Sequence, residues 1–308
     1  MTKDEEDFPI AFSMIVYKHI EQVERLLRMV WRPNNVYCIS IDAKTRKEFV
    51  EAVLSIAKCF DNVFVHPVQV DVQWGTFSVL EPDVHCMDLL WKQNRKWRYF
   101  INLTGQEFPL KTNYELVQIL KAYNGANDIK GTFREANMDR WAGAGVPPAG
   151  LKPRKGAVHI AASRGYVDYV LHNDTAMLLL QWVKKVRIPD EAFFSMLNYN
   201  PHLEVPGSYT GDVDDDKRMF LGRYKLWYPQ DTCSGRIARN ICIMEVRDLP
   251  NLVKAPELFV NKFFYDHHPL AYDCLEKWYH NKVDLEKSGN LEFDATLYRN
   301  RCITRDHF

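Results

Sequence analysis

The chain has 308 residues, and its 40 Lys and Arg balance 40 Asp and Glu, so the formal net charge is zero. Hydrophobic residues make up 46% and aromatic residues 13%, which is ample for a substantial core and excludes a disordered chain. The balanced charge argues against nucleic acid or an anionic membrane surface as the main partner. No stretch has the length of a transmembrane span, and the start, MTKDEEDFPIAF, is acidic before it is apolar, the reverse of a signal peptide. Taken literally, the sequence predicts a soluble globular protein.

The first half alternates short apolar runs with helical patterns. Strands are predicted at Ile10–Val16, Val36–Ile41, Val63–Val65 and Tyr99–Leu103. Helices are predicted between them at Glu21–Val30, Thr45–Lys58 and Ser78–Lys92. This βαβαβ order predicts an α/β protein with a mostly parallel sheet and right-handed crossovers.

Asp42 follows the second predicted strand, where open α/β sheets place groups that hold the sugar or base of a nucleotide. A dehydrogenase is one interpretation of this pattern. However, the first strand turns into its helix through VYKHIEQ, which has none of the glycines that a dinucleotide fingerprint needs. The turn therefore argues strongly against a nicotinamide enzyme, and the chain has no P-loop.

The middle of the chain, residues 131–156, is dense in Gly and Pro and predicts a long surface excursion over the site. An apolar stretch at Val158–Ala162 follows, with helices predicted at Tyr166–Leu171 and Ala176–Val186. Pro189, Asp190 and Glu191 then precede an apolar segment, a pattern typical of a helix start with acidic residues in its first turn.

The segment from Cys233 to Phe263 isolates two cations among apolar residues. Arg239 lies between two cysteines, and Lys262 lies in an apolar run after a short helix predicted at Leu249–Lys254. An Arg fork and a Lys point charge together suit a diphosphate without a metal, whereas the other interpretation is that both are ordinary surface cations.

Several blocks of the chain resemble, in order, those of the core-2/I-branching β-1,6-N-acetylglucosaminyltransferase family, glycosyltransferase family 14. The blocks are FPIAFSMIVYKHIEQVERLLRMVWRPNNVYCISIDAK (8–44), AKCFDNVFV (57–65), INLTGQEFPLKTN (101–113), PDEAFFSML (189–197) and CSG…R…C…DL…LF.NKF (233–263). The resemblance implies a GT-A-like fold with a Rossmann-like N-terminal sheet and helices on both faces. It implies one catalytic domain over 1–308, with a nucleotide-binding half at 8–125 and an acceptor and catalytic half at 126–308.

The resemblance makes Glu191 the catalytic base of an inverting transfer, in which one carboxylate takes the proton of the acceptor hydroxyl. Adjacent helical residues point about 100° apart, so only one of Asp190 and Glu191 should face the pocket. Arg239 and Lys262 match the family's diphosphate-binding pair, which takes the place of a metal, so neither metal nor cofactor is expected. The acidic run GDVDDDKR, with Asp212 and Asp214–Asp216, is interpreted as a solvated loop rather than a manganese site.

Both substrates have matching residues. Val16, Tyr17 and Asp42 align with uridine-contacting positions, although Tyr17 replaces a frequent histidine, and Trp74 with Gly75 matches an element beside the donor. The acceptor residues implied are Arg140, Trp141 and Trp227, and a core role is a second interpretation of Trp227. After Arg140 and Trp141 the core-2 enzymes continue with a basic run, whereas this chain has Ala142–Gly145. The resemblance therefore leaves core-2 acceptor specificity open.

Seven cysteines also suit a reduced cytosolic protein, but the resemblance implies the disulfides Cys38–Cys86 and Cys233–Cys242. Cys59 and Cys274 match cysteines whose partners lie upstream in the family, and Cys302 is unassigned. Of the two sequons, the one at Asn102 is expected to be buried, whereas Asn173 is expected to carry a glycan in a lumenal protein.

The family consists of Golgi type II membrane proteins, so the resemblance predicts a lumenal catalytic domain whose membrane anchor is absent from this sequence. The leading prediction is transfer of GlcNAc from UDP-GlcNAc to a glycan or glycoprotein hydroxyl, forming a β-1,6 branch on an O-glycan. The alternatives are a UDP-glucose or UDP-xylose transferase, or a sugar-binding homologue without turnover.

Overall fold

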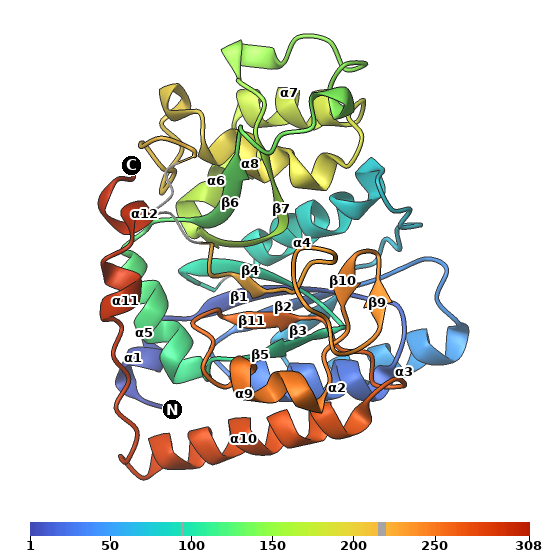
Figure 1. The fold of residues 1–308 in the computed structure, drawn as a ribbon, viewed down its shortest axis with the longest axis vertical. Coiled ribbons are helices and arrows are strands. Elements are labelled where there is room, and N and C mark those ends of the chain that lie inside the picture. The colour runs from blue at the N-terminus through green and yellow to red at the C-terminus, as the bar shows by residue number, and fades with distance from the viewer. Residues whose placement is uncertain (94, 215–219) are drawn as a thin grey trace.

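A six-stranded sheet runs through the middle of the molecule, with the strand order β3-β2-β1-β4-β7-β6 (Figure 1). The structure is a computed structural model that describes residues 1–93, 95–214 and 220–308. Helices cover both faces of this sheet, and two smaller sheets, β5-β11-β8 and β10-β9, accompany it. The expected α/β architecture with a mostly parallel sheet is confirmed.

The parallel part of the sheet is built from the apolar runs of the first half. Its strands are β1 (Ile10–Val16), β2 (Val36–Ile41), β3 (Val63–Val65) and β4 (Tyr99–Thr104). β1 pairs with β2 on one side and β4 on the other, so Ser13 lies opposite both Cys38 and Asn102. Strands buried on both faces need near-continuous apolar sequence, which is why these runs were recognisable in the sequence.

Two antiparallel strands, β6 (Asp128–Thr132) and β7 (Lys155–Ser163), complete the sheet. The expected excursion over 131–156 is therefore too long, because both of its ends belong to strands and the loop spans only 133–154. Gly131 pairs with Gly156, and a Cβ atom on Gly131 would lie 2.1 Å from the ring of Tyr199. These glycines therefore allow close packing inside the sheet.

The helices divide between the two faces of the sheet. One face is covered by α2 (Ile20–Val30), α3 (Lys47–Ala57) and α5 (Asn113–Tyr123). The other face is covered by α4 (Glu81–Lys92), α6 (Arg164–His172), α7 (Asp174–Val183) and α8 (Phe193–Asn198). The predicted helices are confirmed with shifted ends, except that the one expected from Ser78 is divided between η1 (Phe77–Val79) and α4.

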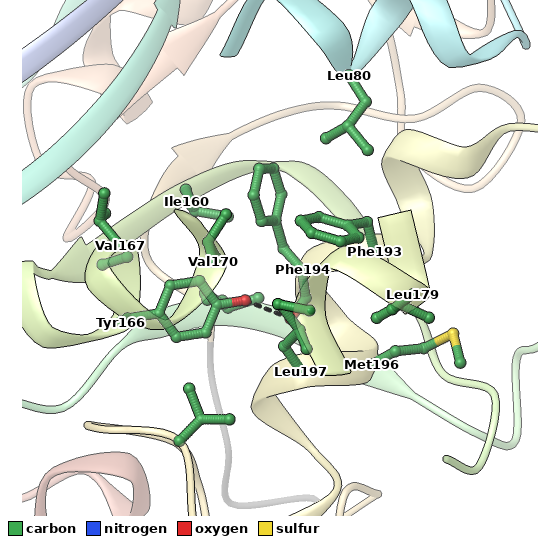
Figure 2. Packing of buried hydrophobic residues seen from close by; sticks show 14 of the residues in the cluster. Leu80, Ile160, Tyr166, Val167, Val170, Leu179, Phe193, Phe194, Met196 and Leu197 are labelled. Atoms are coloured by element: carbon green, nitrogen blue, oxygen red, sulfur yellow. Dashed lines mark hydrogen bonds between the residues drawn. The ribbon is translucent and has the colours of Figure 1, made fainter. Parts of the chain in front are cut away.

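The helix α8 is buried in the core on the face of the sheet that α4, α6 and α7 cover. Phe193, Phe194 and Leu197 are fully buried and pack among residues of α6 and β7 (Figure 2). The Tyr166 hydroxyl donates a hydrogen bond to the Phe194 carbonyl at 2.8 Å. This packing fixes the segment immediately after Glu191.

The C-terminal part adds a smaller layer. The small sheets contain β5 (Glu107–Pro109), β8 (Arg223–Tyr224), β9 (Ile237–Ala238), β10 (Ile241–Cys242) and β11 (Phe259–Asn261). The long helix α10 (Pro269–Lys287) packs against this layer through residues such as Tyr272 and Tyr279, which contact the Phe108 ring.

The remaining elements are short. They are α1 (Lys3–Glu6), η2 (Met138–Arg140), η3 (Pro148–Gly150), η4 (Pro189–Glu191), η5 (Pro201–Leu203), η6 (Val246–Asp248), α9 (Leu249–Leu252), α11 (Thr296–Arg299) and α12 (Cys302–Arg305). Within the described ranges, no helix has both the length and the apolar character that a membrane crossing requires.

Candidate active site

The carboxyl ends of β1 and β2 bring together the residues expected to contact the nucleotide. The Asp42 amide donates to the Val16 carbonyl at 3.0 Å, so Asp42 lies directly beside the end of β1. Tyr17 is 48% exposed, and its hydroxyl accepts a hydrogen bond from Gln106 Nε2 at 2.8 Å. An open sheet edge of this kind is where α/β proteins bind nucleotides.

A loop of residues 70–76 bridges the region of Asp42 and the region of Glu191, the expected catalytic base. The Ala43 amide bonds the Val70 carbonyl at 2.9 Å, and the Gly75 carbonyl accepts from the Ile188 amide at 2.9 Å. Gly75 has φ +81°, a conformation that L side chains rarely adopt. Trp74 is 63% exposed, so its ring is available beside this edge.

Glu191 ends η4 and is held from two directions. The Arg187 amide donates to the Arg140 carbonyl at 3.0 Å, while Ile188 bonds the loop at Gly75. Ile188 has φ +56°, which is costly for a β-branched residue and marks a tightly determined turn. The Arg140 guanidinium reaches the Glu191 carboxylate at 2.5 Å. These contacts bring Trp74, Arg140 and Glu191 to one place.

Asp190 and Glu191 have opposite environments, as expected for neighbouring side chains. Asp190 is buried at 8% exposure, and its Oδ1 has no hydrogen-bond partner among the described residues. Burial, followed by the negative charge of Glu191, raises the pKa of Asp190 to about 7. The Glu191 side chain is 26% exposed, so it is the carboxylate of the pair that solvent and a ligand can reach.

The two expected acceptor tryptophans also differ. Trp227 is 38% exposed, which excludes the core interpretation for this ring. Trp141 is only 6% exposed and belongs to a main core cluster, so its described position is one of packing behind Arg140. Ala142–Gly145 turn immediately after it, and the Gly145 carbonyl accepts a hydrogen bond from Trp182 Nε1 at 3.2 Å.

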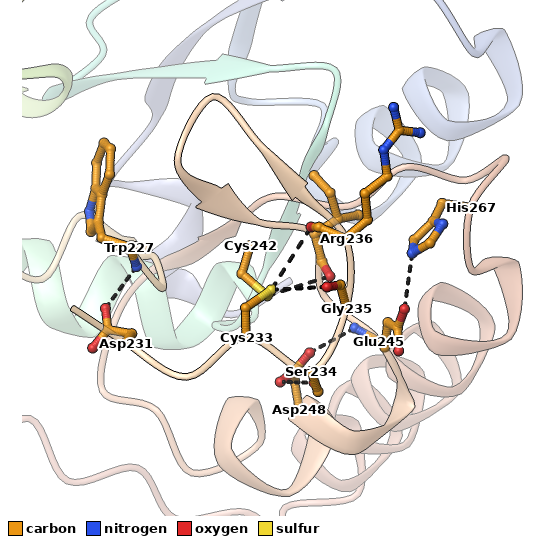
Figure 3. The surroundings of a disulfide bond; sticks show 11 residues. Trp227, Asp231, Cys233, Ser234, Gly235, Arg236, Cys242, Glu245, Asp248 and His267 are labelled. Carbon is orange, nitrogen blue, oxygen red and sulfur yellow. Dashed lines mark hydrogen bonds and ion pairs between the residues drawn. A yellow bond between two sulfur atoms is a disulfide. The ribbon is translucent and has the colours of Figure 1, made fainter. Parts of the chain in front are cut away.

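Arg239 is at the tip of the β9–β10 hairpin. Arg239 and Asn240 have φ of +53° and +60°. Positive φ at both central residues is what a two-residue type I′ hairpin turn requires. The Cys233–Cys242 disulfide joins β10 to the segment before β9, as expected (Figure 3). A further pair, Ser234 Oγ to Asp248 Oδ1 at 2.9 Å, ties the same segment to η6. The turn that carries Arg239 is therefore restrained on both sides.

Lys262 follows β11 and is buried at 8% exposure. No acidic side chain among residues 1–93, 95–214 and 220–308 forms an ion pair with its ammonium group. Burial, and then the positive charges of Arg239 and Lys18, lower the pKa of Lys262 to about 8. The structure thus brings Lys262 and Arg239 within electrostatic reach of each other in a cluster of positive charge.

Lys18 is a member of this cluster that sequence reasoning missed. Its ammonium group lies 3.9 Å from the centroid of the Phe264 ring, and Lys262 lies 5.4 Å from the same centroid. Burial is the main cause that lowers the pKa of Lys18; the negative charge of Asp266 opposes this shift, and Arg236 adds to it. The position of Lys18 directly after Tyr17, at the end of a predicted strand, was the available signal.

The acidic run differs from the expected solvated loop at Asp214. Its carboxylate accepts hydrogen bonds from the Phe133 and Arg134 amides and from Thr132 Oγ1, so it fixes the start of the 133–154 loop. Asp215 and Asp216 lie outside the described residues. Within the described part of the chain, no group of His, Cys, Asp and Glu side chains has an arrangement that could hold a metal ion.

The remaining cysteine and sequon predictions have clear positions. The Cys38–Cys86 disulfide is present and joins β2 to α4, whereas Cys59 and Cys274 are exposed thiols. Cys302 is buried. Asn102 is buried at 3% exposure, as expected. Asn173 is partly exposed and caps α7 by accepting a hydrogen bond from the Thr175 amide at 2.8 Å.

The chain is similar to known proteins over most of its length. The family model described as Core-2/I-Branching enzyme matches residues 10–253. A Bos taurus β-1,3-galactosyl-O-glycosyl-glycoprotein β-1,6-N-acetylglucosaminyltransferase is 34% identical over 313 residues, which cover 92% of this chain and 72% of the relative. A Homo sapiens enzyme of that name is 32% identical over 309 residues, with the same coverage. An Ovis aries enzyme with that name and the number 3 is 34% identical over 310 residues, or 92% of this chain and 70% of the relative. With its GT-A-like α/β fold, the chain belongs to the Core-2/I-branching enzyme family of glycosyltransferases.

Proposed function

We propose that this protein transfers GlcNAc from UDP-GlcNAc to a hydroxyl of an O-linked glycan, with inversion and without a metal, and so forms a β-1,6 branch. The relatives are named for this reaction on O-glycosyl glycoproteins. The observation that carries the proposal is the accessible Glu191 carboxylate, which backbone hydrogen bonds at Arg140 and Gly75 hold beside the nucleotide edge. The expected compartment is the Golgi lumen.

Positive charge supports the donor half of the proposal. Lys18, Arg239 and Lys262 form a cluster next to Tyr17, and the diphosphate of UDP is the ligand that suits their charge. Val16 and Asp42 would then face the uridine, and Trp74 the donor sugar. The cations would stabilise charge that grows on the departing UDP, which is the contribution a metal makes in other transferases.

The chemistry needs one base. The Glu191 carboxylate accepts the proton of the acceptor hydroxyl while that oxygen forms a bond to the anomeric carbon of the donor. The bond from this carbon to the β-phosphate oxygen breaks on the opposite face, and its electron pair leaves with UDP. Glu191 then passes the proton to solvent. Inversion follows because attack and departure occur on opposite faces.

The acceptor half is supported by the exposed ring of Trp227, since aromatic faces suit the apolar side of a pyranose. Arg140 supplies a guanidinium beside Glu191 that a sugar hydroxyl can share. The turn at Ala142–Gly145 has no basic side chain, whereas the core-2 enzymes have a basic run at this position. The acceptor is therefore expected to differ from the core-2 acceptor in the part that this run would contact.

The test is a calorimetric titration of the folded chain with UDP-GlcNAc in excess EDTA. Binding with an affinity that Arg239→Ala or Lys262→Ala reduces by more than about tenfold would support the metal-free clamp, because each removes one charge-assisted contact. Arg247→Ala, an exposed cation on η6, is the matched control and should bind normally.

A screen of O-glycan acceptors with the same preparation completes the test. Product containing a β-1,6-linked GlcNAc would support the transfer proposed here. No binding of UDP-GlcNAc by a folded chain would contradict the GlcNAc donor and leave UDP-glucose or UDP-xylose to be tested in competition. Donor binding without transfer to any acceptor would favour a sugar-binding homologue.

A further inference from the structure

The lysine two residues after Asp42 is held by three oxygen atoms. Lys44 Nζ lies 3.0 Å from Asp42 Oδ1. It also lies 2.6 Å from Asp71 Oδ1 and 2.7 Å from the Val72 carbonyl oxygen. An ammonium group has three N–H groups, so these three oxygens match all of its donors. Lys44 therefore differs from an ordinary surface lysine, although its side chain is 55% exposed.

The three contacts join two segments of the candidate donor site. The first acceptor, Asp42, follows β2, whereas the other two belong to the loop of residues 70–76, which also carries Trp74. This loop begins with a parallel bridge between Asp42 and Val70. Lys44 adds a second attachment, which lies nearer to Trp74 in the chain.

The attachment acts on the loop as a whole. Asp71 contacts Lys44 through Oδ1 and accepts a hydrogen bond from Gln73 Nε2 through Oδ2 at 3.2 Å. The Gly75 carbonyl, further along, accepts from the Ile188 amide at 2.9 Å. The loop is therefore held to the Asp42 segment at one end and to the turn before Glu191 at the other.

The Asp42 carboxylate is oriented by the same lysine in two ways. The Lys44 amide donates to Asp42 Oδ1 at 2.9 Å, and the Lys44 ammonium group lies 3.0 Å from that oxygen. The Asp42 side chain is 12% exposed. Among the described residues no hydrogen bond involves Asp42 Oδ2, so this is the oxygen left to accept from a nucleotide.

We propose that Lys44 is a positioning residue for the donor: its ammonium group attaches the loop 70–76 to Asp42, and so holds the Asp42 carboxylate and the Trp74 ring in place before a uridine nucleotide binds. This inference rests on the UDP-sugar binding proposed above. A loop that is already fixed loses less conformational freedom on binding, so affinity increases without a contact between Lys44 and the ligand.

The first test measures the loop in the ligand-free protein. Lys44→Met removes the charge at similar length, and Lys44→Arg keeps the charge. Lys47→Met is the matched control, because Lys47 is 85% exposed and pairs with Glu51 on its own helix at 3.4 Å. Amide hydrogen exchange in residues 70–76 should be about three- to tenfold faster in Lys44→Met and near the wild-type rate in Lys44→Arg and Lys47→Met. Equal exchange in all four proteins would overturn the inference.

The second test separates positioning from direct contact with phosphate. Calorimetry gives the affinity for UDP, and competition against UDP gives the affinity for uridine. Lys44→Met should lower both affinities by the same factor, about three- to tenfold, with Tm unchanged because an exposed ion pair adds little to global stability. A loss of UDP affinity without a loss of uridine affinity would make Lys44 a phosphate ligand and contradict the inference.

A variant of the partner residue gives an independent comparison. Asp71→Asn should reproduce the faster exchange and the weaker uridine binding. Adding it to Lys44→Met should cause little further loss, because both substitutions remove the same contact. Additive losses would show that the two residues act separately and would count against the inference. If the folded wild type binds neither uridine nor UDP, the proposed function fails, while the exchange rates still decide whether Lys44 fixes the loop.

Discussion

Glu191 and Asp190 are adjacent in sequence, but burial gives them different chemical properties. Asp190 is enclosed without a hydrogen-bond partner for its Oδ1 among the described residues, and its pKa is raised to about 7, so near neutral pH it is substantially protonated. Glu191 is accessible and held by Arg140. Apart from the family resemblance, which pointed to Glu191, the residue pattern could not choose between two carboxylates one position apart, because the choice depends on which of them the fold encloses.

Replacing each of these carboxylates by its amide should therefore have unequal effects. We expect Glu191→Gln to lower kcat by about 10²–10⁴-fold, because general-base catalysis contributes that much, while UDP-GlcNAc affinity stays near that of the wild type. Asp190→Asn is the matched control and should retain most activity at pH 7, because an amide resembles the protonated acid. Steady-state transfer assays measure both. Full activity of Glu191→Gln would contradict the base assignment.

Donor affinity should depend on pH through Lys262. Its pKa in the free protein is lowered to about 8, so its charge is lost as the pH rises through that value. We expect the affinity for UDP to decrease above about pH 8 and to remain level below it. Lys262→Arg should remove this dependence, since arginine stays charged. Calorimetric titrations from about pH 6.5 to about pH 9 measure the effect, and a parallel decrease in both proteins would contradict it.

The secondary structure that the sequence predicted well is the part that is buried on both faces. β1, β2, β3 and β4 are continuous apolar runs, and the helices between them repeat apolar residues at helical spacing. β6, DIKGT, was missed because its strand character comes from pairing with β7 rather than from composition. α10 was also missed, although Ala271, Leu275 and Tyr279 are buried at helical spacing and gave a usable signal.

At the site, the family resemblance supplied residues that lie near one another in the fold, but not the groups behind them. Lys225, His159 and Glu107 are far apart in the sequence and form no motif, so only the arrangement of β5, β7 and β8 reveals their contacts. Trp141 was expected in the acceptor site, but a tryptophan that packs and one that binds a sugar have the same sequence signal.

The two disulfides should have separable effects. Cys38–Cys86 spans 48 residues and Cys233–Cys242 spans 9, so loop-closure entropy gives about 4 and about 2.5 kcal/mol of unfolding free energy respectively. We expect Cys38→Ala with Cys86→Ala mainly to lower stability in urea. Cys233→Ala with Cys242→Ala should instead mainly lower UDP affinity, because it releases the turn that carries Arg239. Equal losses of donor affinity in both variants would contradict this division.

Inside the small sheet, an ion pair that solvent does not reach links β5 to β8, and its arginine also contacts the main sheet. Glu107 and Arg223 are both 0% exposed, and Arg223 also hydrogen-bonds the Asn102 carbonyl in β4. We expect Arg223→Met to destabilise the whole molecule by about 3–5 kcal/mol, because it leaves Glu107 charged and buried. Urea unfolding measures this loss. Adding Glu107→Gln should recover part of it, whereas a larger loss in the double variant would contradict the explanation.

The surface of the whole molecule distinguishes the two sequons. Asn102 Nδ2 donates to Asp83 and to the Val158 carbonyl inside the fold, while Asn173 lies at the partly exposed start of α7. When the chain is expressed through a secretory pathway, we expect a glycosidase-sensitive mass that Asn173→Gln removes. Asn102→Gln is expected to lower the yield of folded protein and leave the glycan at Asn173 unchanged. Loss of the glycan in Asn102→Gln alone would reverse the assignment.

The hairpin that carries Arg239 shares its backbone with the segment that carries Trp227. The Tyr228 amide bonds the Asn240 carbonyl at 2.9 Å, and the Cys242 amide bonds the Leu226 carbonyl at 3.0 Å. If the donor diphosphate contacts Arg239 as proposed, a shift of this hairpin on binding would also move the segment that carries Trp227. Thermodynamic linkage requires any coupling between the two sites to be reciprocal, so UDP would change acceptor affinity by the same factor by which the acceptor changes UDP affinity. Acceptor affinity measured with and without saturating UDP would show whether this shared backbone couples the two sites.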